Sequence, residues 1–358
     1  MLTVAVINQK GGVGKTTTTV NLGAGLARLG NRVLLLDFDP QANLTSHLEP
    51  TGDPNEGTTY DLLRDRRPIA ELVRETGEEN LFVVPAGDDL AGVEIELASE
   101  IGRESILRDA LARAEADGLA ADFVLIDCAP SLGLLAVNAL TAADEALVPI
   151  QAEFFALSGM AKFVEVQRLV QNRLNDRLRL AGIVICMWKG NARLSHEVRE
   201  EVENVFGDVL YRGVVRQNVK LAEAPSAART IFEYAPDSNG AADYAALTIE
   251  FLRRHEGTVP ADAMERLLRS GPPPAAAPPE ETEAAAETAE SVEPEGRTAP
   301  VAPEGPQSSG EGGEGEEGGE PENPLQPDAP PADEGGTRPD APTAIDPVQA
   351  DGGGPGPS

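Results

Sequence analysis

A glycine-rich loop near the start of the chain combines the residue types that bind a nucleoside triphosphate. Residues 10–18 read Lys-Gly-Gly-Val-Gly-Lys-Thr-Thr-Thr. Glycines let backbone N–H groups close around phosphate oxygens, and a helix that follows such a loop adds a favourable dipole. Lys15 can reach the β- and γ-phosphates, and the hydroxyl of Thr16 can ligate Mg²⁺. The loop therefore predicts a phosphate-binding site that uses Mg²⁺.

Lys10 adds a second cation to this loop, five residues before Lys15. An ordinary phosphate loop has no lysine directly before its paired glycines. Catalysis of phosphoryl transfer depends mostly on positioning and on electrostatic stabilisation, and two ammonium groups near one triphosphate serve both. Lys10 is therefore a candidate catalytic residue beside Lys15.

Three aspartates follow apolar runs that read as buried strands. Asp37 ends the run at residues 33–37, Asp39 comes two residues later, and Asp127 ends the run at residues 123–127. Parallel sheets bind ligands at the carboxyl ends of their strands, so these carboxylates are candidate site residues. Taken alone, the aspartate pair after residue 36 suits a metal site or a capped turn equally well.

Apolar runs alternate with helical patterns along the first 255 residues. The expected strands are residues 3–8, 33–37, 81–85, 123–127, 146–150, 181–187 and 209–214. The expected helices include residues 20–29, 105–115, 158–174, 194–206 and 240–255. This alternation predicts an α/β fold with a mainly parallel sheet covered by helices on both faces. The stripe formed by Leu157, Met160, Val164 and Val170 is expected to pack in the core.

The sequence changes character after residue 270. Residues 271–358 contain no Phe, Trp or Tyr, and they carry 20 acidic residues against two basic ones. Such a segment cannot bury enough apolar surface to offset its ordering entropy, so we expect it to be disordered. We divide the chain into an ATPase-like domain at 1–257 and an acidic Pro/Gly/Glu-rich tail at 258–358. A solvating or tethering role is favoured for the tail, and docking to a basic partner is the alternative.

The net charge points to an unusual surface. The whole chain carries −31, and removing the −18 of residues 271–358 leaves −13 on residues 1–270. That region contains only five lysines: Lys10, Lys15, Lys162, Lys189 and Lys220. Acidic excess with scarce lysine is typical of surfaces that stay hydrated in concentrated salt, which suggests a halophilic source. An ordinary acidic cytoplasmic protein is the alternative.

The remaining reactive residues argue against several classes of protein. Cys128 and Cys186 lie far apart in apolar strand contexts, which disfavours a disulfide framework, a zinc site and a cluster bound by paired cysteines. Three scattered histidines receive no chemical role: His47, His196 and His255. No apolar run approaches the roughly 18 residues of a membrane span, and no charged leader precedes the first apolar run. We therefore expect a cytoplasmic protein without a membrane partner.

Several motifs together resemble the ParA/MinD family of P-loop ATPases. Residues 8–17 resemble its deviant Walker A box, residues 37–41 its switch I, and residues 123–127 its Walker B strand. Residues 128–133 resemble switch II, although Ala129 stands where the family more often has proline. Residues 215–226 resemble the segment of the ParA branch that contacts adenine. The resemblance covers roughly residues 1–255.

The resemblance implies a Mg²⁺-dependent ATP hydrolase with a deviant-Walker P-loop fold. It implies that Lys10 reaches across a homodimer to the partner's nucleotide, that Asp39 positions the attacking water, and that Thr16 and Asp127 serve Mg²⁺. Residues expected to bind the nucleotide are Lys10, Gly11, Gly12, Val13, Gly14, Lys15, Thr16, Thr17, Arg216 and Asn218. Arg216 stands where the family usually has proline, whereas Asn218 matches its base-contacting asparagine.

The family resemblance favours a partition ATPase of the ParA/Soj type. Its ATP-bound dimer would bind DNA without sequence preference on the nucleoid, and a ParB-like centromere-binding protein would trigger hydrolysis. The basic residues expected to contact DNA are Arg193, Arg216 and Lys220, with Lys189 nearby; solvated surface charges are the alternative. Other functions left open are a MinD-like membrane-associated positioner, a ParA-like positioner of a protein cargo, and a metabolic enzyme such as an amide-forming ligase. The acidic tail disfavours the membrane function, because an anionic membrane would repel it.

Overall fold

The computed structural model of the chain describes residues 1–53, 56–153, 156–255 and 258–269. Residues 271–358, for which we expect disorder, lie outside the described residues.

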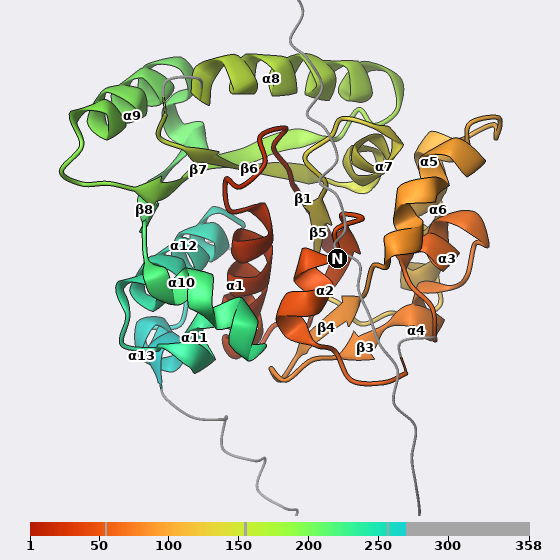
Figure 1. Cartoon of the computed structure of the whole chain (residues 1–358), viewed down its shortest axis with the longest axis horizontal. Coiled ribbons are helices and arrows are strands. Elements are labelled where there is room, and N and C mark those ends of the chain that lie inside the picture. The colour runs from red at the N-terminus through yellow and green to blue at the C-terminus, as the bar shows by residue number, and fades with distance from the viewer. Residues whose placement is uncertain (54–55, 154–155, 256–257, 270–358) are drawn as a thin grey trace, which may run out of the picture. The chain divides into compact units, whose positions relative to one another are not determined.

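Eight strands form one sheet in the order β3-β4-β2-β5-β1-β6-β7-β8 (Figure 1). Their bounds are Leu2–Val6 (β1), Val33–Phe38 (β2), Arg74–Glu75 (β3), Leu81–Val84 (β4), Phe123–Cys128 (β5), Glu145–Gln151 (β6), Arg179–Trp188 (β7) and Leu210–Arg216 (β8). Every pairing is parallel except that of β3 with β4. All seven strands expected from the sequence are confirmed. The two-residue strand β3 was missed, because two residues are too few to show an apolar period.

Helices cover both faces of the sheet, as the alternation of elements predicted (Figure 1). On one face lie α1 (Lys15–Arg28), α2 (Asn43–Leu48), α11 (Ile231–Tyr234), α12 (Asn239–His255) and α13 (Ala263–Leu268). On the other lie α3 (Thr59–Arg64), α4 (Ile69–Leu72), α5 (Val93–Glu96), α6 (Ile106–Ala116), α7 (Leu134–Ala142), α8 (Ala156–Arg173) and α9 (Arg193–Phe206). The short α10 (Val219–Glu223) follows β8.

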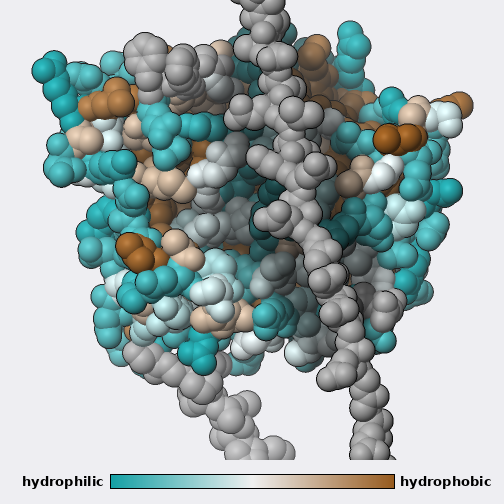
Figure 2. All heavy atoms as spheres, in the orientation of Figure 1, coloured by the Kyte–Doolittle hydropathy of each residue, from teal (hydrophilic) through white to brown (hydrophobic). Residues whose placement is uncertain are grey.

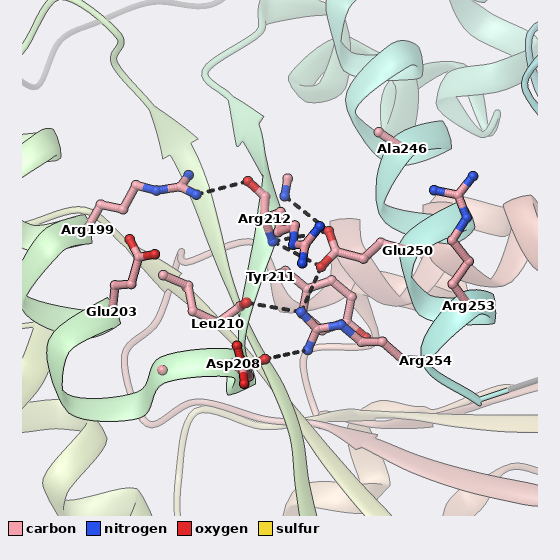
Figure 3. A pocket seen from close by; sticks show the side chains of 12 residues that line it. Arg199, Glu203, Asp208, Leu210, Tyr211, Arg212, Ala246, Glu250, Arg253 and Arg254 are labelled. Carbon is pink, nitrogen blue, oxygen red and sulfur yellow. Dashed lines mark hydrogen bonds and ion pairs between the residues drawn. The ribbon is translucent and has the colours of Figure 1, made fainter. Parts of the chain in front are cut away.

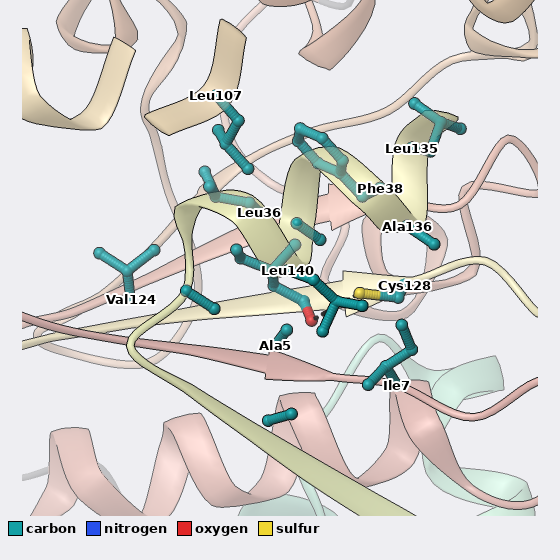
Figure 4. Close-up of a cluster of buried hydrophobic side chains, with 14 of the residues drawn as sticks. Ala5, Ile7, Leu36, Phe38, Leu107, Val124, Cys128, Leu135, Ala136 and Leu140 are labelled. Carbon is teal, nitrogen blue, oxygen red and sulfur yellow. Dashed lines mark hydrogen bonds between the residues drawn. The ribbon is translucent and has the colours of Figure 1, made fainter. Parts of the chain in front are cut away.

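Successive residues of each central strand enter opposite cores. Val4 and Val6 of β1 belong to the core beneath α1 and α12, whereas Ala5 and Ile7 face α7 (Figure 4). A strand buried on both faces needs an almost continuous apolar run, which explains why these strands were legible in the sequence. The stripe expected in the core is confirmed: it packs in the cluster under α8, through Leu157, Met160, Val164 and Val170.

Two helices differ from expectation. The first helix begins at Lys15 rather than at residue 20, because its opening turns consist of threonines that give no apolar period. Helix α13 lies past residue 257, where we expected the tail to begin. Its Ala263 and Leu267 are buried in the cluster that α1 and α12 form, so the packed fold extends at least to Leu268.

The surface carries its large apolar side chains mostly as single residues. The face in Figure 2 is largely hydrophilic, with scattered hydrophobic residues. Within the described residues, no helix is long and apolar enough to cross a membrane.

Candidate nucleotide site

The phosphate loop joins the end of β1 to the start of α1 and is shaped by two glycines. Gly12 and Gly14 have φ values of 71° and 94°, in the left-handed region that disfavours side chains. Gly14 also forms the N-cap of α1, and no side chain caps the first N–H groups of that helix. These donors remain available to an anion, which fits a phosphate group at this point.

Lys15 points into the protein rather than into solvent. The residue is 7% exposed, and its Nζ donates one long hydrogen bond of 3.5 Å to the backbone oxygen of Lys10. Burial lowers the pKa of Lys15, an effect opposed by the nearby carboxylates of Asp127 and Asp39. A buried ammonium with so few partners fits a site for a polyanion such as a triphosphate.

Thr16 and Asp127 come together at the carboxyl end of β5. The Thr16 hydroxyl donates a 2.6 Å hydrogen bond to Oδ2 of Asp127, and Thr19 donates to Oδ1 at 3.3 Å. Asp127 is completely buried, and burial raises its pKa to about 8 with a further contribution from the charge of Asp37. Hydroxyl and carboxylate oxygens are the ligands Mg²⁺ prefers, so the pair fits a magnesium site. Among the described residues, no group of three His, Cys, Asp or Glu side chains could hold a metal ion, so phosphate or water oxygens would complete the coordination.

The two aspartates after β2 have different surroundings. Asp37 is buried opposite Asp127, its partner in the parallel register, and its Oδ2 accepts hydrogen bonds from Thr45 N at 2.9 Å and Thr45 Oγ1 at 2.7 Å. Burial raises the pKa of Asp37 to about 6. Asp37 thereby ties α2 to the strand, as the capped-turn alternative anticipated. Asp39 is also buried, but its charge acts on Lys15 inside the site.

The Lys10 side chain contacts residues at and just after the end of β6. Its Nζ forms an ion pair with Glu153 and lies 3.4 Å from Oε1 of Gln151, and its side chain is 48% exposed. Asn8 supports this geometry, because its Oδ1 accepts from Lys10 N at 2.9 Å and its Nδ2 donates to the backbone oxygen of Pro149 at 2.7 Å. Our sequence analysis assigned no role to Gln151 or Glu153, which come directly after the strand expected at residues 146–150.

A mainly apolar cavity of about 290 Å³ adjoins the phosphate loop. Gly14 and Thr17 form one wall, and both residues expected to contact the base, Arg216 and Asn218, line the cavity. The side chain of Asn218 accepts from Lys220 N at 2.8 Å and so caps α10. Val215, Val219, Leu221 and Ala222 of the segment expected to contact adenine also line the cavity, and so do Cys186, Met187 and Tyr244, for which the sequence predicted no contact with the base. The size and lining suit a flat heterocycle.

Each basic residue expected to contact DNA is paired with a carboxylate of its own surroundings. Arg193 contacts Glu197 at 2.6 Å, and Lys220 contacts Glu223 at 2.8 Å. Arg216 forms a forked pair with Asp243, whose shortest contact is 2.6 Å. The sequence placed these cations but not their partners, so the net charge at each position is lower than expected.

Comparisons with known proteins place the chain among P-loop ATPases. Residues 1–180 match the family model described as AAA domain. The chain is 47% identical over 247 residues to the sporulation initiation inhibitor protein Soj of Bacillus subtilis, covering 69% of this chain and 96% of that protein. It is 44% identical over 251 residues to the chromosome partitioning protein ParA of Myxococcus xanthus, covering 70% and 88%.

Solved structures share the fold. Cobyrinic acid a,c-diamide synthase from Mycobacterium smegmatis, with a bound ATP analogue and magnesium, superposes with a TM-score of 0.61 at 32% identity, covering 72% of this chain and 97% of that chain. The septum site-determining protein MinD of Pyrococcus horikoshii, complexed with Mg-ADP, superposes with a TM-score of 0.57 at 24% identity, covering 70% and 95%. The second likeness shows the fold alone.

Proposed function

Because this chain belongs to the ParA/Soj family of chromosome-partitioning ATPases, we propose that it segregates DNA through an ATP-driven cycle of dimerisation. The ATP-bound homodimer would bind DNA without sequence preference, and a ParB-like centromere-binding protein would stimulate hydrolysis. The chain would act in the cytoplasm, on the nucleoid.

ATP and Mg²⁺ are the cofactors that fit this site. The solved diamide synthase and MinD structures hold an ATP analogue or ADP with magnesium. In this chain, the uncapped start of α1 and the buried Lys15 fit the phosphates, and the Thr16–Asp127 pair fits Mg²⁺. When bound, Mg²⁺ neutralises charge on the terminal phosphates.

The site residues divide into three roles. The residues that would hold the phosphates are Gly11, Gly12, Val13, Gly14, Lys15, Thr16 and Thr17. Asp39, buried and close enough to act on the Lys15 charge, would orient the attacking water. Arg216 and Asn218 would border the base.

The position of Lys10 carries the proposal for a dimer. Its side chain is half-exposed and contacts Gln151 and Glu153, whereas Lys15 is buried. In this arrangement Lys10 does not serve its own phosphate loop, so it is available to the nucleotide of a second copy. A cation supplied by a partner subunit raises phosphoryl-transfer rates by about 10³–10⁵ where it has been measured.

Mixing two inactive variants tests this arrangement. A dimer of one Lys10→Ala subunit and one Asp39→Ala subunit has one site with an intact Asp39 and an intact Lys10 from the other subunit. We expect each variant alone to lose ATP turnover and the mixture to recover up to about a quarter of the wild-type rate, which is the statistical share of complete sites. No recovery, with mixed dimers demonstrated by differential tagging, would remove Lys10 from its role across the interface.

Nucleotide binding separates the two lysines. Lys15→Ala should lose binding of a fluorescent ATP analogue, because the phosphates lose their buried cation. Lys10→Ala should retain monomer binding within a few-fold of wild type, because the Lys10 ammonium is paired with Glu153. The surface variant Lys162→Ala is the matched control. Equal losses in Lys10→Ala and Lys15→Ala would contradict the assignment.

An amide-forming ligase is the second candidate, favoured by the 32% identity to the diamide synthase. A ligase would need a carboxylic acid and a nitrogen donor before it consumed ATP. ATP turnover in buffer alone, together with ATP-dependent retention of duplex DNA, would support the partition function. A MinD-like function predicts instead that ATP drives the chain onto anionic liposomes, and an ATP-bound dimer without duplex affinity at any salt would leave the positioning of a protein cargo.

A further inference from the structure

Four arginines from three elements line a surface cavity whose residues lie far along the chain from the phosphate loop. Arg199 of α9, Arg212 of β8, and Arg253 and Arg254 of α12 line a cavity of about 880 Å³ (Figure 3). We refer to these four residues as the arginine groove. None of them was among the residues expected to bind DNA.

One of the four has a structural function. Arg254 donates to the backbone oxygens of Asp208 at 3.2 Å and Leu210 at 3.0 Å, pairs with Glu250 at 2.7 Å, and lies 3.9 Å from the ring centre of Tyr211. The Arg254 guanidinium therefore holds α12 against β8 through contacts within the protein.

Both carboxylate oxygens of Glu250 also accept hydrogen bonds from within the protein. Its two carboxylate oxygens accept from the backbone N–H of Arg212 at 3.0 and 3.1 Å and from that of Gly213 at 3.1 Å, in addition to Arg254. Glu250 thus caps the open edge of β8. Its charge is already shared among three donors, so it does little to neutralise the Arg212 guanidinium.

The other three arginines are less engaged with their surroundings than Arg254. Arg199 donates to the backbone oxygen of Arg212 at 3.1 Å. Within the described part of the chain, no ion pair is found for Arg199, Arg212 or Arg253. Glu203 and Asp208 also line the cavity, so its four arginines face three acidic residues and the local charge is +1. That sign is opposite to the −13 of residues 1–270.

Tyr211 supplies a buried polar group at the same place. The residue is completely buried and lines the cavity, and its hydroxyl has no hydrogen-bond partner among the described residues. Gly182 permits this position, since a Cβ there would lie 2.1 Å from the Tyr211 ring. Buried hydroxyls nearly always have a partner, so an unsatisfied one marks a point where an acceptor is missing.

We propose that the arginine groove binds the phosphodiester backbone of duplex DNA. The proposal rests on the partition function above and replaces Arg193, Arg216 and Lys220 as the principal contacts. A guanidinium that is already paired with a carboxylate offers a phosphate little net attraction. The guanidinium groups of Arg199, Arg212 and Arg253 form no ion pair with the described residues, so their attraction for a phosphate is greater. Their planar forks match phosphate oxygens, and their origin in three elements suits an extended polyanion better than a small ion.

Salt dependence provides the readout. The full-length chain is incubated with ATP and a fluorescent duplex of random sequence, and its affinity is measured across a salt series. We expect the double variant Arg212→Ala/Arg253→Ala to bind at least about tenfold more weakly, and the log–log salt slope to fall by about 0.9 for each phosphate contact removed. Arg212→Lys/Arg253→Lys should recover most of the affinity, because it keeps the charges.

Matched variants separate the possible outcomes. Arg193→Ala and Lys220→Ala remove cations that are already paired, and both should bind DNA within about threefold of wild type. ATP turnover and the thermal midpoint of the double variant check that the fold is intact. Wild-type affinity in the double variant, or tighter binding of poly-glutamate than of DNA to the groove, would overturn the proposal. Failure of the wild-type chain to bind DNA at any salt would instead overturn the partition function.

Discussion

At the scale of single residues, the buried titratable groups are the most informative. Lys15, Asp37 and Asp127 lie at the ends of neighbouring elements. Burial lowers the pKa of Lys15 and raises the pKa of both aspartates, so it favours the neutral form of each group. A folded chain holds such groups only where a ligand or fixed hydrogen bonds compensate them. Asp37 accepts two hydrogen bonds from Thr45, whereas Lys15 Nζ donates a single long one among the described residues. This contrast identifies Lys15 as the group built to meet an external anion.

Two histidines without an expected role should give opposite pH dependences. Burial lowers the pKa of His47, which bonds to the backbone oxygen of Arg229 at 2.9 Å. Burial also lowers the pKa of His255, but its 2.6 Å contact with Glu145 and its 2.7 Å hydrogen bond with the backbone oxygen of Phe251 together outweigh this effect and raise the pKa overall. His255 therefore contributes stability that is present below its unfolded pKa and is lost as the pH rises through its folded value.

Thermal unfolding of ligand-free protein checks this sign. Relative to wild type, His255→Gln should lose more stability at pH 5.5, a value near or below the usual histidine pKa of about 6.5, than at pH 9. Glu145→Gln should behave in the same way, since it removes the partner. His47→Gln is the control, and its loss of stability should be smaller at pH 5.5 than at pH 9. A histidine whose pKa is lowered by folding destabilises the fold in acid, and the substitution removes that effect. Parallel pH profiles for wild type and His255→Gln would disprove the pairing.

At the scale of elements, the close contact between α1 and α12 positions the phosphate loop. Gly25 of α1 faces Thr248 of α12, and a Cβ at Gly25 would lie 2.3 Å from Oγ1 of Thr248. Alanine normally favours a helix over glycine by about 1 kcal/mol. At Gly25 the clash with Thr248 outweighs this gain in helix propensity, because α1 and α12 would have to separate to admit a Cβ. The substitution is therefore expected to lower the stability of the fold.

We therefore expect Gly25→Ala to destabilise the fold by about 1–3 kcal/mol in urea unfolding. Gly159→Ala in α8 is the matched control, since a Cβ there meets nothing within 4 Å and should stabilise slightly. Thr248→Ala combined with Gly25→Ala should recover part of the loss, because it removes the two nearest atoms. A stabilising Gly25→Ala would show that the helices move apart freely.

The same elements show what sequence reasoning could reach. The strands, the phosphate loop and the three aspartates were legible because each depends on a local pattern of apolar runs and glycines. The partners were not: Lys10 meets Glu153 across 143 positions, and Arg216 meets Asp243 across 27. No local pattern encodes such contacts. The burial of α13 was missed for the same reason, since only tertiary packing orders so short a helix.

At the scale of the whole molecule, the acidic surface should make both stability and DNA binding depend on salt. Residues 1–270 carry −13, and screening shortens from about 10 Å at 0.1 M to about 3 Å at 1 M. Self-repulsion within the fold therefore weakens as salt rises. A halophilic origin would extend this behaviour to molar concentrations.

We expect the thermal midpoint of the full-length chain to rise steadily from 0.1 to 1 M KCl, while DNA affinity falls over the same range. Sucrose at matched osmolality is the control, because it does not screen charge. A midpoint that is unchanged or lower at 1 M KCl would argue for an ordinary acidic protein with no adaptation to salt.

Both margins of the sheet are closed to further strands. On one side β3 is only two residues long, and on the other Glu250 and Asp243 accept the backbone N–H groups of β8. These features disfavour joining of copies by extension of the sheet. In the proposed ATP-bound dimer the subunits would instead meet through side-chain surfaces near the phosphate loops. Loss of the terminal phosphate on hydrolysis would then weaken the contact between them and release two intact monomers.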